Sequence, residues 1–213
     1  MTASTSPPDV PRLLDRELLR EGLLICRRRP GWFPAKAIML ATASRWGRIY
    51  KDAWNHDAII VRDPEDGRLK IGDALMGPGC VLTPIEEWEK DCVENGTKII
   101  VLEVVGATRE QELAAAAWWL KNVHTHKYDK VAIWQIGLRY VFGEWFTSSV
   151  GLASRYYCSE GVRDSYQFGV SPPLNPWRKK NVDPGDTRES WKAERLAELM
   201  AYTKEGLQYR IAG

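Results

Sequence analysis

The sequence has few histidines and cysteines, and this shortage excludes several kinds of site. Its 213 residues include three histidines and four cysteines. No two cysteines form a C-x-x-C pair, and no histidine and cysteine have the spacing of a zinc site. We therefore expect no metal and no cofactor. Widely spaced cysteines in a chain without a signal peptide also favour free thiols in a reducing compartment.

Strong charge and long apolar runs are missing as well. The net charge is +2, so no basic field argues for nucleic acid, and the run Arg27 to Arg29 is most simply solvated charge. The longest apolar run, Ala35 to Ala43, is too short to span a bilayer. Residues Met1 to Pro11 lack the basic and apolar regions of a secretory signal. We expect no integral membrane segment and synthesis in the cytoplasm. A role outside the cell would need delivery by a phage particle, lysis or a secretion machine.

Tryptophan is the residue that the chain has in excess, with ten in all. Hydrophobic residues make up 44% and charged residues 27%, which suits a soluble globular protein with a sizeable core. Tryptophans are more often core or interface than substrate platform. Several nevertheless lie in polar contexts, where an amphipathic ring can line a groove, and of these we take Trp46 and Trp54 as candidate substrate-binding residues.

The spacing of apolar residues predicts an α+β fold, with a central antiparallel sheet flanked by helices. The expected strands are Gly22 to Cys26, His56 to Arg62, Arg68 to Leu75 and Lys98 to Val105. The expected helices are Arg12 to Arg20, Ala35 to Ser44, two that open at the capping boxes Thr83–Glu86 and Thr108–Gln111, one that begins at Cys158, and Thr187 to Glu205. Residues Arg45 to Asn55 are expected to form a loop.

Three segments follow from these elements. Residues 1–20 are an N-terminal lead with a short helix, and residues 21–170 form the catalytic or binding domain. Residues 171–213 are a linker, rich in proline at its start, and a C-terminal amphipathic helix. That helix is either docked on the domain or available to a protein partner.

The second and third strands place a histidine beside an aspartate. The stretch Asp63-Pro-Glu-Asp-Gly67 is strong turn chemistry. A four-residue loop would pair Arg62 with Gly67, and His56 would then lie opposite Asp73 with both side chains on one face of the hairpin.

Cys158 lies in the stretch Tyr156-Tyr157-Cys158-Ser159-Glu160, which suits the first turn of a helix. The partial positive charge and free N–H groups of a helix N-terminus favour a thiolate and can stabilise an oxyanion. A cysteine between aromatic residues is more often a small buried hydrophobe, and that alternative stays open. Glu160, at the third helical position, is expected to cap the helix or meet a basic residue rather than to catalyse.

Taken in order, these segments resemble the circularly permuted papain-like, NlpC-type superfamily, which includes relatives of bacterial cell-wall peptidases and the lecithin:retinol acyltransferase group. Glu21 to Ile25 resembles its opening strand, although Leu23 stands where an acidic residue is usual. Asn55 to Val61 resembles its histidine strand, and Ile71 to Ala74 the strand with its third polar residue. Tyr156 to Glu160 resembles its "y-C-S-E" nucleophile motif. The resemblance covers roughly residues 21 to 169.

The resemblance implies a permuted papain-like fold and a cysteine hydrolase. Cys158 would be the nucleophile, His56 the base and then the acid, and Asp73 the group that orients the imidazole, with Asp57 as a competing orienter. Tyr157 would lie beside the substrate. The implied substrate is an amide bond, as in a peptidoglycan stem peptide.

Two alternatives stay open. The same cysteine and histidine could serve a lipid thioesterase or acyltransferase, for which tryptophans would line an apolar groove. A non-catalytic phage or secretion-system protein could also keep the fold, with its C-terminal helix as the working surface.

Overall fold

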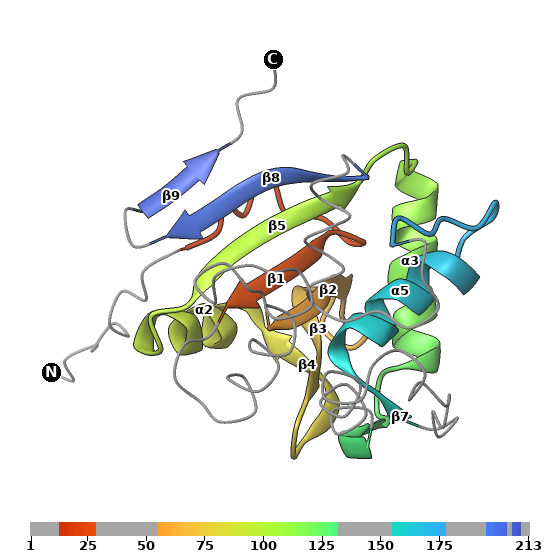
Figure 1. Cartoon of the computed structure of the whole chain (residues 1–213), viewed down its shortest axis with the longest axis horizontal. Coiled ribbons are helices and arrows are strands. Elements are labelled where there is room, and N and C mark those ends of the chain that lie inside the picture. The colour runs from red at the N-terminus through yellow and green to blue at the C-terminus, as the bar shows by residue number, and fades with distance from the viewer. Residues whose placement is uncertain (1–12, 29–54, 132–154, 178–194, 204–205, 210–213) are drawn as a thin grey trace, which may run out of the picture.

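A seven-stranded antiparallel sheet forms the centre of the molecule (Figure 1). The computed structural model describes residues 13–28, 55–131, 155–177, 195–203 and 206–209. The strands follow the order β4-β3-β2-β1-β5-β8-β9. Their bounds are β1 Leu24–Arg28, β2 His56–Arg62, β3 Leu69–Leu75, β4 Gly79–Pro84, β5 Lys98–Val104, β8 Leu196–Thr203 and β9 Gly206–Tyr209. The α+β class and the antiparallel sheet are thus confirmed, and β5 is central, as its apolar sequence predicts.

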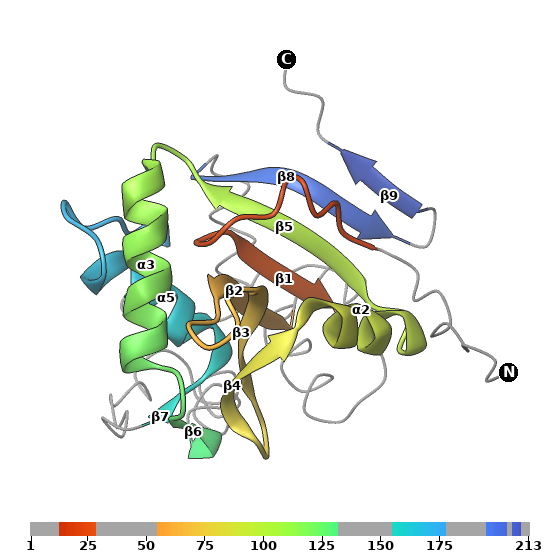
Figure 2. The same cartoon turned by 180° about the vertical axis from the view of Figure 1, so that it is seen from behind.

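Three helices within the described residues cover the two faces of the sheet: α2 Ile85–Glu94, α3 Arg109–Asn122 and α5 Cys158–Phe168. Helices α3 and α5 lie together on one face, and α2 packs at the other (Figures 1 and 2). Two short strands, β6 Lys127–Tyr128 and β7 Arg155–Tyr156, pair in parallel beside the start of α5.

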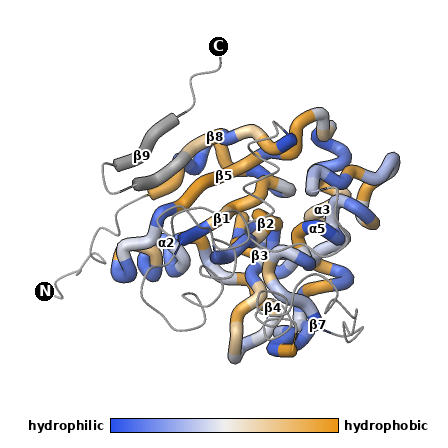
Figure 3. The backbone as a smooth tube through the Cα atoms, in the orientation of Figure 1, coloured by the Kyte–Doolittle hydropathy of each residue, from blue (hydrophilic) through white to orange (hydrophobic). Residues whose placement is uncertain are grey.

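Alternation along the strands divides the core into two clusters. On the face of α3 and α5, Leu24 and Ile59 pack with Trp119. On the face of α2, Ile25 and Ile60 pack with the helix. Figure 3 shows apolar residues along β1 and β5, which are covered on both sides. A strand in such a position needs apolar side chains on both faces.

The two predicted capping boxes have different outcomes. Thr108 opens α3 as predicted, because its hydroxyl accepts from the Gln111 N–H and its own N–H donates to the Gln111 side chain. The prediction for Thr83 is wrong. Strand β4 continues through Pro84, which is the N-cap of α2 and makes no side-chain cap bond.

The predicted helix at Arg12 to Arg20 is also wrong, because residues 13–20 contain only a turn. The N–H groups of Leu13 and Leu14 both donate to Glu89 Oε1, at 2.9 and 2.8 Å. Arg16 pairs with the other Glu89 oxygen at 2.7 Å. The buried carboxylate of α2 therefore satisfies backbone donors that a helix would otherwise leave to water.

The C-terminal helix predicted for Thr187 to Glu205 is wrong where the structure describes it. From Leu196 the chain is strand β8, which pairs with β5, and β9 pairs with β8. This segment is therefore part of the central sheet, and its described residues do not form the helical surface suggested for a protein partner. The start of the predicted helix, and the helix and loop predicted within residues 35–54, lie outside the described residues.

A β-bulge explains the misleading pattern at the C-terminus. The register shifts so that Val101 pairs with Met200 while Leu102 pairs with Glu198. The extra residue reverses which face the strand presents, since Leu196 packs with the α3 and α5 cluster and Met200 with the α2 cluster. Apolar residues four apart on a bulged strand imitate the spacing of a helix.

Gly22 is a position that is expected to tolerate a larger residue poorly. It has a φ of 89°, and a Cβ at this position would lie 2.6 Å from the Glu112 backbone oxygen. Gly22→Ala should lower the free energy of unfolding by about 2–5 kcal/mol, from backbone strain and overpacking together.

Gly67→Ala is the matched control in a urea titration. Gly67 has a φ of 71° but no heavy atom within 4 Å of an added Cβ. Gly67→Ala should then lower the free energy of unfolding only by the backbone strain, which is about 1–2 kcal/mol. Equal losses in the two variants would contradict the close packing of Gly22.

Candidate active site

His56 and Asp73 meet on adjacent strands, although the predicted register is off by two residues. Arg62 pairs with Leu69, not with Gly67. A shift of two residues keeps every side chain on its face, because the strand period is two. His56 Nε2 is hydrogen-bonded to Asp73 Oδ1.

The second oxygen of Asp73 has its own partners. Trp88 Nε1 donates to Asp73 Oδ2 at 3.3 Å, and an Arg27 guanidinium nitrogen lies 3.9 Å from the same oxygen. The Arg27 guanidinium also lies over the Trp88 ring, 5.4 Å from its centroid. Burial raises the pKa of Asp73, but the His56 charge, the His56 hydrogen bond and Arg27 together bring it below its ordinary value. The carboxylate is therefore fixed in position and ionised.

Arg27 and Trp88 are residues that sequence reasoning missed. The run beginning at Arg27 was expected to be solvated, yet Arg27 is buried. It is held by the ring of Trp88 and by Asp91, whose Oδ2 lies 3.1 Å from Arg27 Nη1. Arg27 lies two residues after the buried Ile25, and side chains two apart on a strand point to the same face. This spacing is the one local signal that Arg27 faces the core.

The pKa of His56 is raised to about 9. Burial lowers this pKa, but the charge of Asp73 outweighs burial, and a negative charge on Cys158 raises it further. The imidazole is thus a cation at neutral pH. Because Nε2 is bonded to Asp73, Nδ1 is the ring nitrogen that remains for proton exchange.

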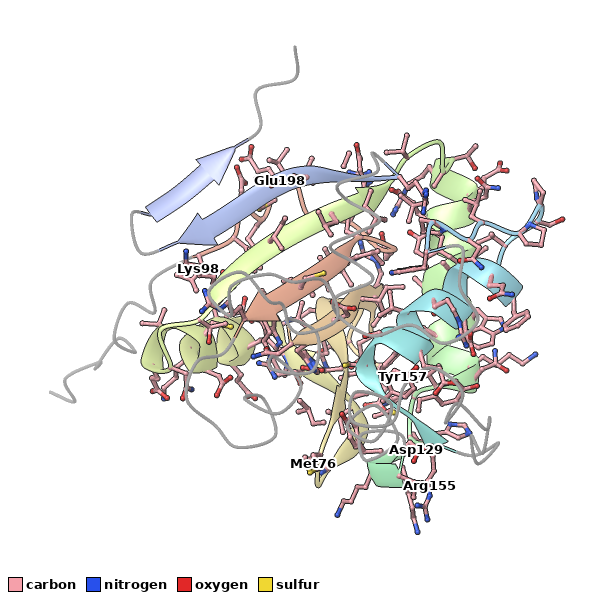
Figure 4. All side chains as sticks on the ribbon, viewed as in Figure 1. Met76, Lys98, Asp129, Arg155, Tyr157 and Glu198 are labelled. Atoms are coloured by element: carbon pink, nitrogen blue, oxygen red, sulfur yellow. The ribbon has the colours of Figure 1, made fainter. Side chains whose placement is uncertain are left out.

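Cys158 is the first residue of α5, as the sequence predicts. Its N-cap, Tyr157, is in an extended conformation, and the Cys158 side chain is buried. The first N–H groups of a helix have no acceptor within it, so the Cys158 N–H is available to an oxyanion. Figure 4 shows Tyr157 at the end of α5 that meets the sheet.

Glu160 caps this helix and pairs with a basic residue, as predicted. Its carboxylate accepts from the Tyr157 N–H and lies 3.7 Å from Arg163 Nη2. Burial, aided by the nearby carboxylates of Asp164 and Asp129, raises its pKa to about 7. The role is structural, and Glu160 is left out of the chemistry.

Cys158 and Asp57 share the sheet face that α3 and α5 cover. Cys158 packs there with Cys26, and Asp57 pairs with Cys26 across β1 and β2. Burial and Asp57 raise the pKa of Cys26 well above its ordinary value. Asp57 therefore affects the pKa of the neighbouring Cys26 thiol. The structure favours Asp73 over Asp57 as the carboxylate that orients His56.

No hydrogen bond joins Cys158 and His56 in the described part of the chain. Cys158 packs in the cluster under α3 and α5, whereas the Asp73 that holds His56 is bonded to Trp88 of α2. The thiol is near enough to affect the pKa of His56, and its Sγ lies 3.9 Å from Ser159 Oγ. Contacts between a nucleophile and its base are often long in a ligand-free protein and tighten when substrate binds.

The remaining sequence candidates are distributed as follows. Tyr157 is buried beside Cys158, whereas Trp46 and Trp54 lie outside the described residues. Cys80 and Cys92 are buried free thiols, and burial raises the pKa of each to about 12. Such thiols are poor nucleophiles at neutral pH.

Among the described residues, no three histidine, cysteine, aspartate or glutamate side chains are placed so that they could hold a metal ion together. No helix in the described ranges is both long and apolar enough to cross a membrane.

The His56–Asp73 pair should give stability a defined pH window. The pKa of His56 rises from 6.5 to about 9 on folding, so its contribution is complete below pH 6.5 and is lost as the pH rises through about 9. The pKa of Asp73 falls below 3.8 on folding, so its contribution is present above pH 3.8 and is lost under more acidic conditions. Urea midpoints should therefore decline from pH 6.5 to 9 in the wild type. In His56→Gln this decline should be smaller, and an unchanged decline would contradict the pairing.

Comparisons with known proteins place the chain in no family. No family model matches it, and no curated protein matches it. Among solved structures it is similar to metalloprotein yiiX from Escherichia coli O157:H7, a DUF1105 protein. That similarity has a TM-score of 0.48 and 19% identity, and it covers 89% of this chain and 88% of the other. Neither fold family nor function is carried over from it.

Proposed function

We propose that this chain is a cysteine hydrolase that cleaves an amide bond through an acyl-enzyme on Cys158. The observation that carries the proposal is the buried His56–Asp73 pair. It holds a cationic imidazole, with a pKa of about 9, within electrostatic reach of a cysteine at a helix N-terminus. Both influences favour a thiolate at neutral pH.

The order of events follows from these positions. The Cys158 thiolate attacks the carbonyl carbon, and the resulting oxyanion accepts from the Cys158 N–H. His56 then gives the proton on Nδ1 to the leaving amine as the C–N bond breaks. The neutral imidazole takes a proton from water, whose oxygen attacks the thioester and releases the acid and the thiolate. Asp73 stays ionised throughout and holds the ring through Nε2.

A permuted papain-like arrangement is part of the proposal. It is supported by the order of the parts, since the histidine and aspartate lie on adjacent strands before the helix that begins with the cysteine. The proposed substrate class is a peptide such as a peptidoglycan stem. Reaching that substrate would require delivery by a phage particle, lysis or a secretion machine.

Purified protein should be incubated with muropeptides, and products and enzyme should be analysed by mass spectrometry. We expect amide cleavage and an acyl adduct on Cys158. Cys158→Ala should abolish both. Cleavage of acyl esters alone would replace the proposal with a thioesterase. Activity in Cys158→Ala, or no turnover of either substrate class, would refute a cysteine hydrolase.

A further inference from the structure

A pocket lined by basic side chains lies at the end of the molecule where β6 and β7 pair. It has a volume of about 320 Å³ and is lined by Thr125, His126, Lys127 and Arg155. We call these four residues the basic pocket. Among the described residues, no carboxylate lines it, and neither Lys127 nor Arg155 forms an ion pair with another of these residues. By contrast, Arg16, Arg20, Arg62, Arg109 and Arg163 each pair with a carboxylate.

One polar atom of the pocket residues lacks a partner. His126 Nδ1 is buried and has no hydrogen-bond partner in the structure. The imidazole is held by its edge-to-face contact with the Tyr156 ring, at 5.6 Å between centroids. A buried ring nitrogen without a partner is costly, and a bound ligand would remove that cost.

The wall of the basic pocket is anchored to β4. The Thr125 N–H donates to the Cys80 carbonyl at 3.0 Å, and the Cys80 N–H donates to the His126 carbonyl at 2.8 Å. Gly79 allows this approach, because a Cβ there would lie 2.7 Å from the His126 oxygen. The pocket is therefore shaped before any ligand arrives, which lowers the entropic cost of binding.

The basic pocket lies close along the chain to the candidate nucleophile. Strand β7 begins at Arg155, and the extended chain reaches Cys158 three residues later. At about 3.3 Å per residue, the two Cα atoms are at most about 10 Å apart. Figure 4 shows Arg155 beside Asp129, below Tyr157 and the start of α5. Asp129 is buried, its carboxylate accepts from the Val131 N–H, and it is not among the residues that line the pocket.

We propose that the basic pocket binds a carboxylate of the substrate, two or three residues from the bond that is cleaved. The planar Arg155 guanidinium can bind a carboxylate with two parallel hydrogen bonds, and Lys127 adds a positive charge. This inference rests on the proposed function and narrows it to acidic peptides. In active enzyme, Arg155→Gln should raise KM for a substrate that carries the carboxylate, and should leave kcat nearly unchanged.

Binding can be tested without turnover, in Cys158→Ala protein. Glutarate is the probe and uncharged glutaramide its control, and the His126 ring resonances report binding by NMR. We expect saturable shifts with glutarate and none with glutaramide. Arg155→Gln should weaken glutarate binding at least about tenfold. Arg155→Lys keeps the positive charge but lacks the planar guanidinium, and it should lose less affinity for glutarate than Arg155→Gln.

Lys90→Gln is the matched control, because Lys90 is an exposed lysine on α2 that pairs only loosely with Glu94, at 4.0 Å. It should leave glutarate binding unchanged. Equal binding of glutarate and glutaramide would overturn the proposed carboxylate site. So would a loss of glutarate affinity in Lys90→Gln equal to the loss in Arg155→Gln. Because Cys158→Ala cannot form an acyl-enzyme, these results do not depend on whether the wild type is a hydrolase.

Discussion

His56→Gln is expected to lower kcat/KM for amide hydrolysis by a factor of about 10³ or more. Glutamine can still donate a hydrogen bond to Asp73, so the buried carboxylate keeps a partner. It cannot exchange a proton with Cys158 or with the leaving amine. The loss should therefore appear in kcat, measured with the substrate identified by muropeptide digestion.

His124→Gln is the control for this substitution. His124 follows α3 and stacks on the Trp119 ring at 6.1 Å between centroids, away from the Asp73 pair. Its replacement should change kcat/KM by no more than about twofold. If the two variants lost activity equally, His56 would have no special role in the reaction.

Asp73→Ala should have the largest effect on the site's electrostatics and on stability. With the carboxylate gone, burial and Arg27 lower the pKa of His56 and only the charge of Cys158 raises it, so the pKa should fall well below about 9. In the same step the indole N–H of Trp88 loses its acceptor, and the Arg27 guanidinium loses a carboxylate 3.9 Å away. Breaking a buried ionic group in this way costs about 3–5 kcal/mol.

Two measurements check this prediction. An NMR titration of the imidazole resonances gives the pKa of His56, assigned by comparison with His56→Gln. Urea unfolding at pH 7 gives the stability change, with Asp66→Ala as the control because Asp66 is an exposed turn residue that pairs with Lys70. A His56 pKa that stays near 9 in Asp73→Ala would mean that another group sets it.

The sequence predicted the faces of the hairpin but not its register. Faces follow from the period of two, and an even shift preserves them. The register is set by the turn. There the Asp63 N–H donates to the Arg68 carbonyl and the Asp63 carboxylate accepts from the Glu65 N–H, at 2.9 and 2.8 Å. The first bond places Asp63 opposite Arg68, so the four-residue loop starts one residue later than predicted, and the turn sequence alone does not reveal this shift.

The other wrong or missing predictions have a common cause, which is contact between segments that are distant in the sequence. Glu89 captures the N–H groups of Leu13 and Leu14, so a helical pattern becomes a turn. Trp88 and Arg27 reach Asp73 from separate elements, and no local spacing connects them. The position of Cys158 at the start of a helix could be predicted, because the signals that begin a helix lie in neighbouring residues.

The most direct test of the account is the pH dependence of iodoacetamide labelling at Cys158, located by mass spectrometry, in the wild type and in His56→Gln. A free thiol has a pKa of about 8.5. The account predicts that Cys158 of the wild type reacts well below pH 8, and that His56→Gln removes this reactivity. Labelling no faster than that of a free thiol, or labelling only after unfolding, would contradict the thiolate–imidazolium pair and with it the proposed hydrolase.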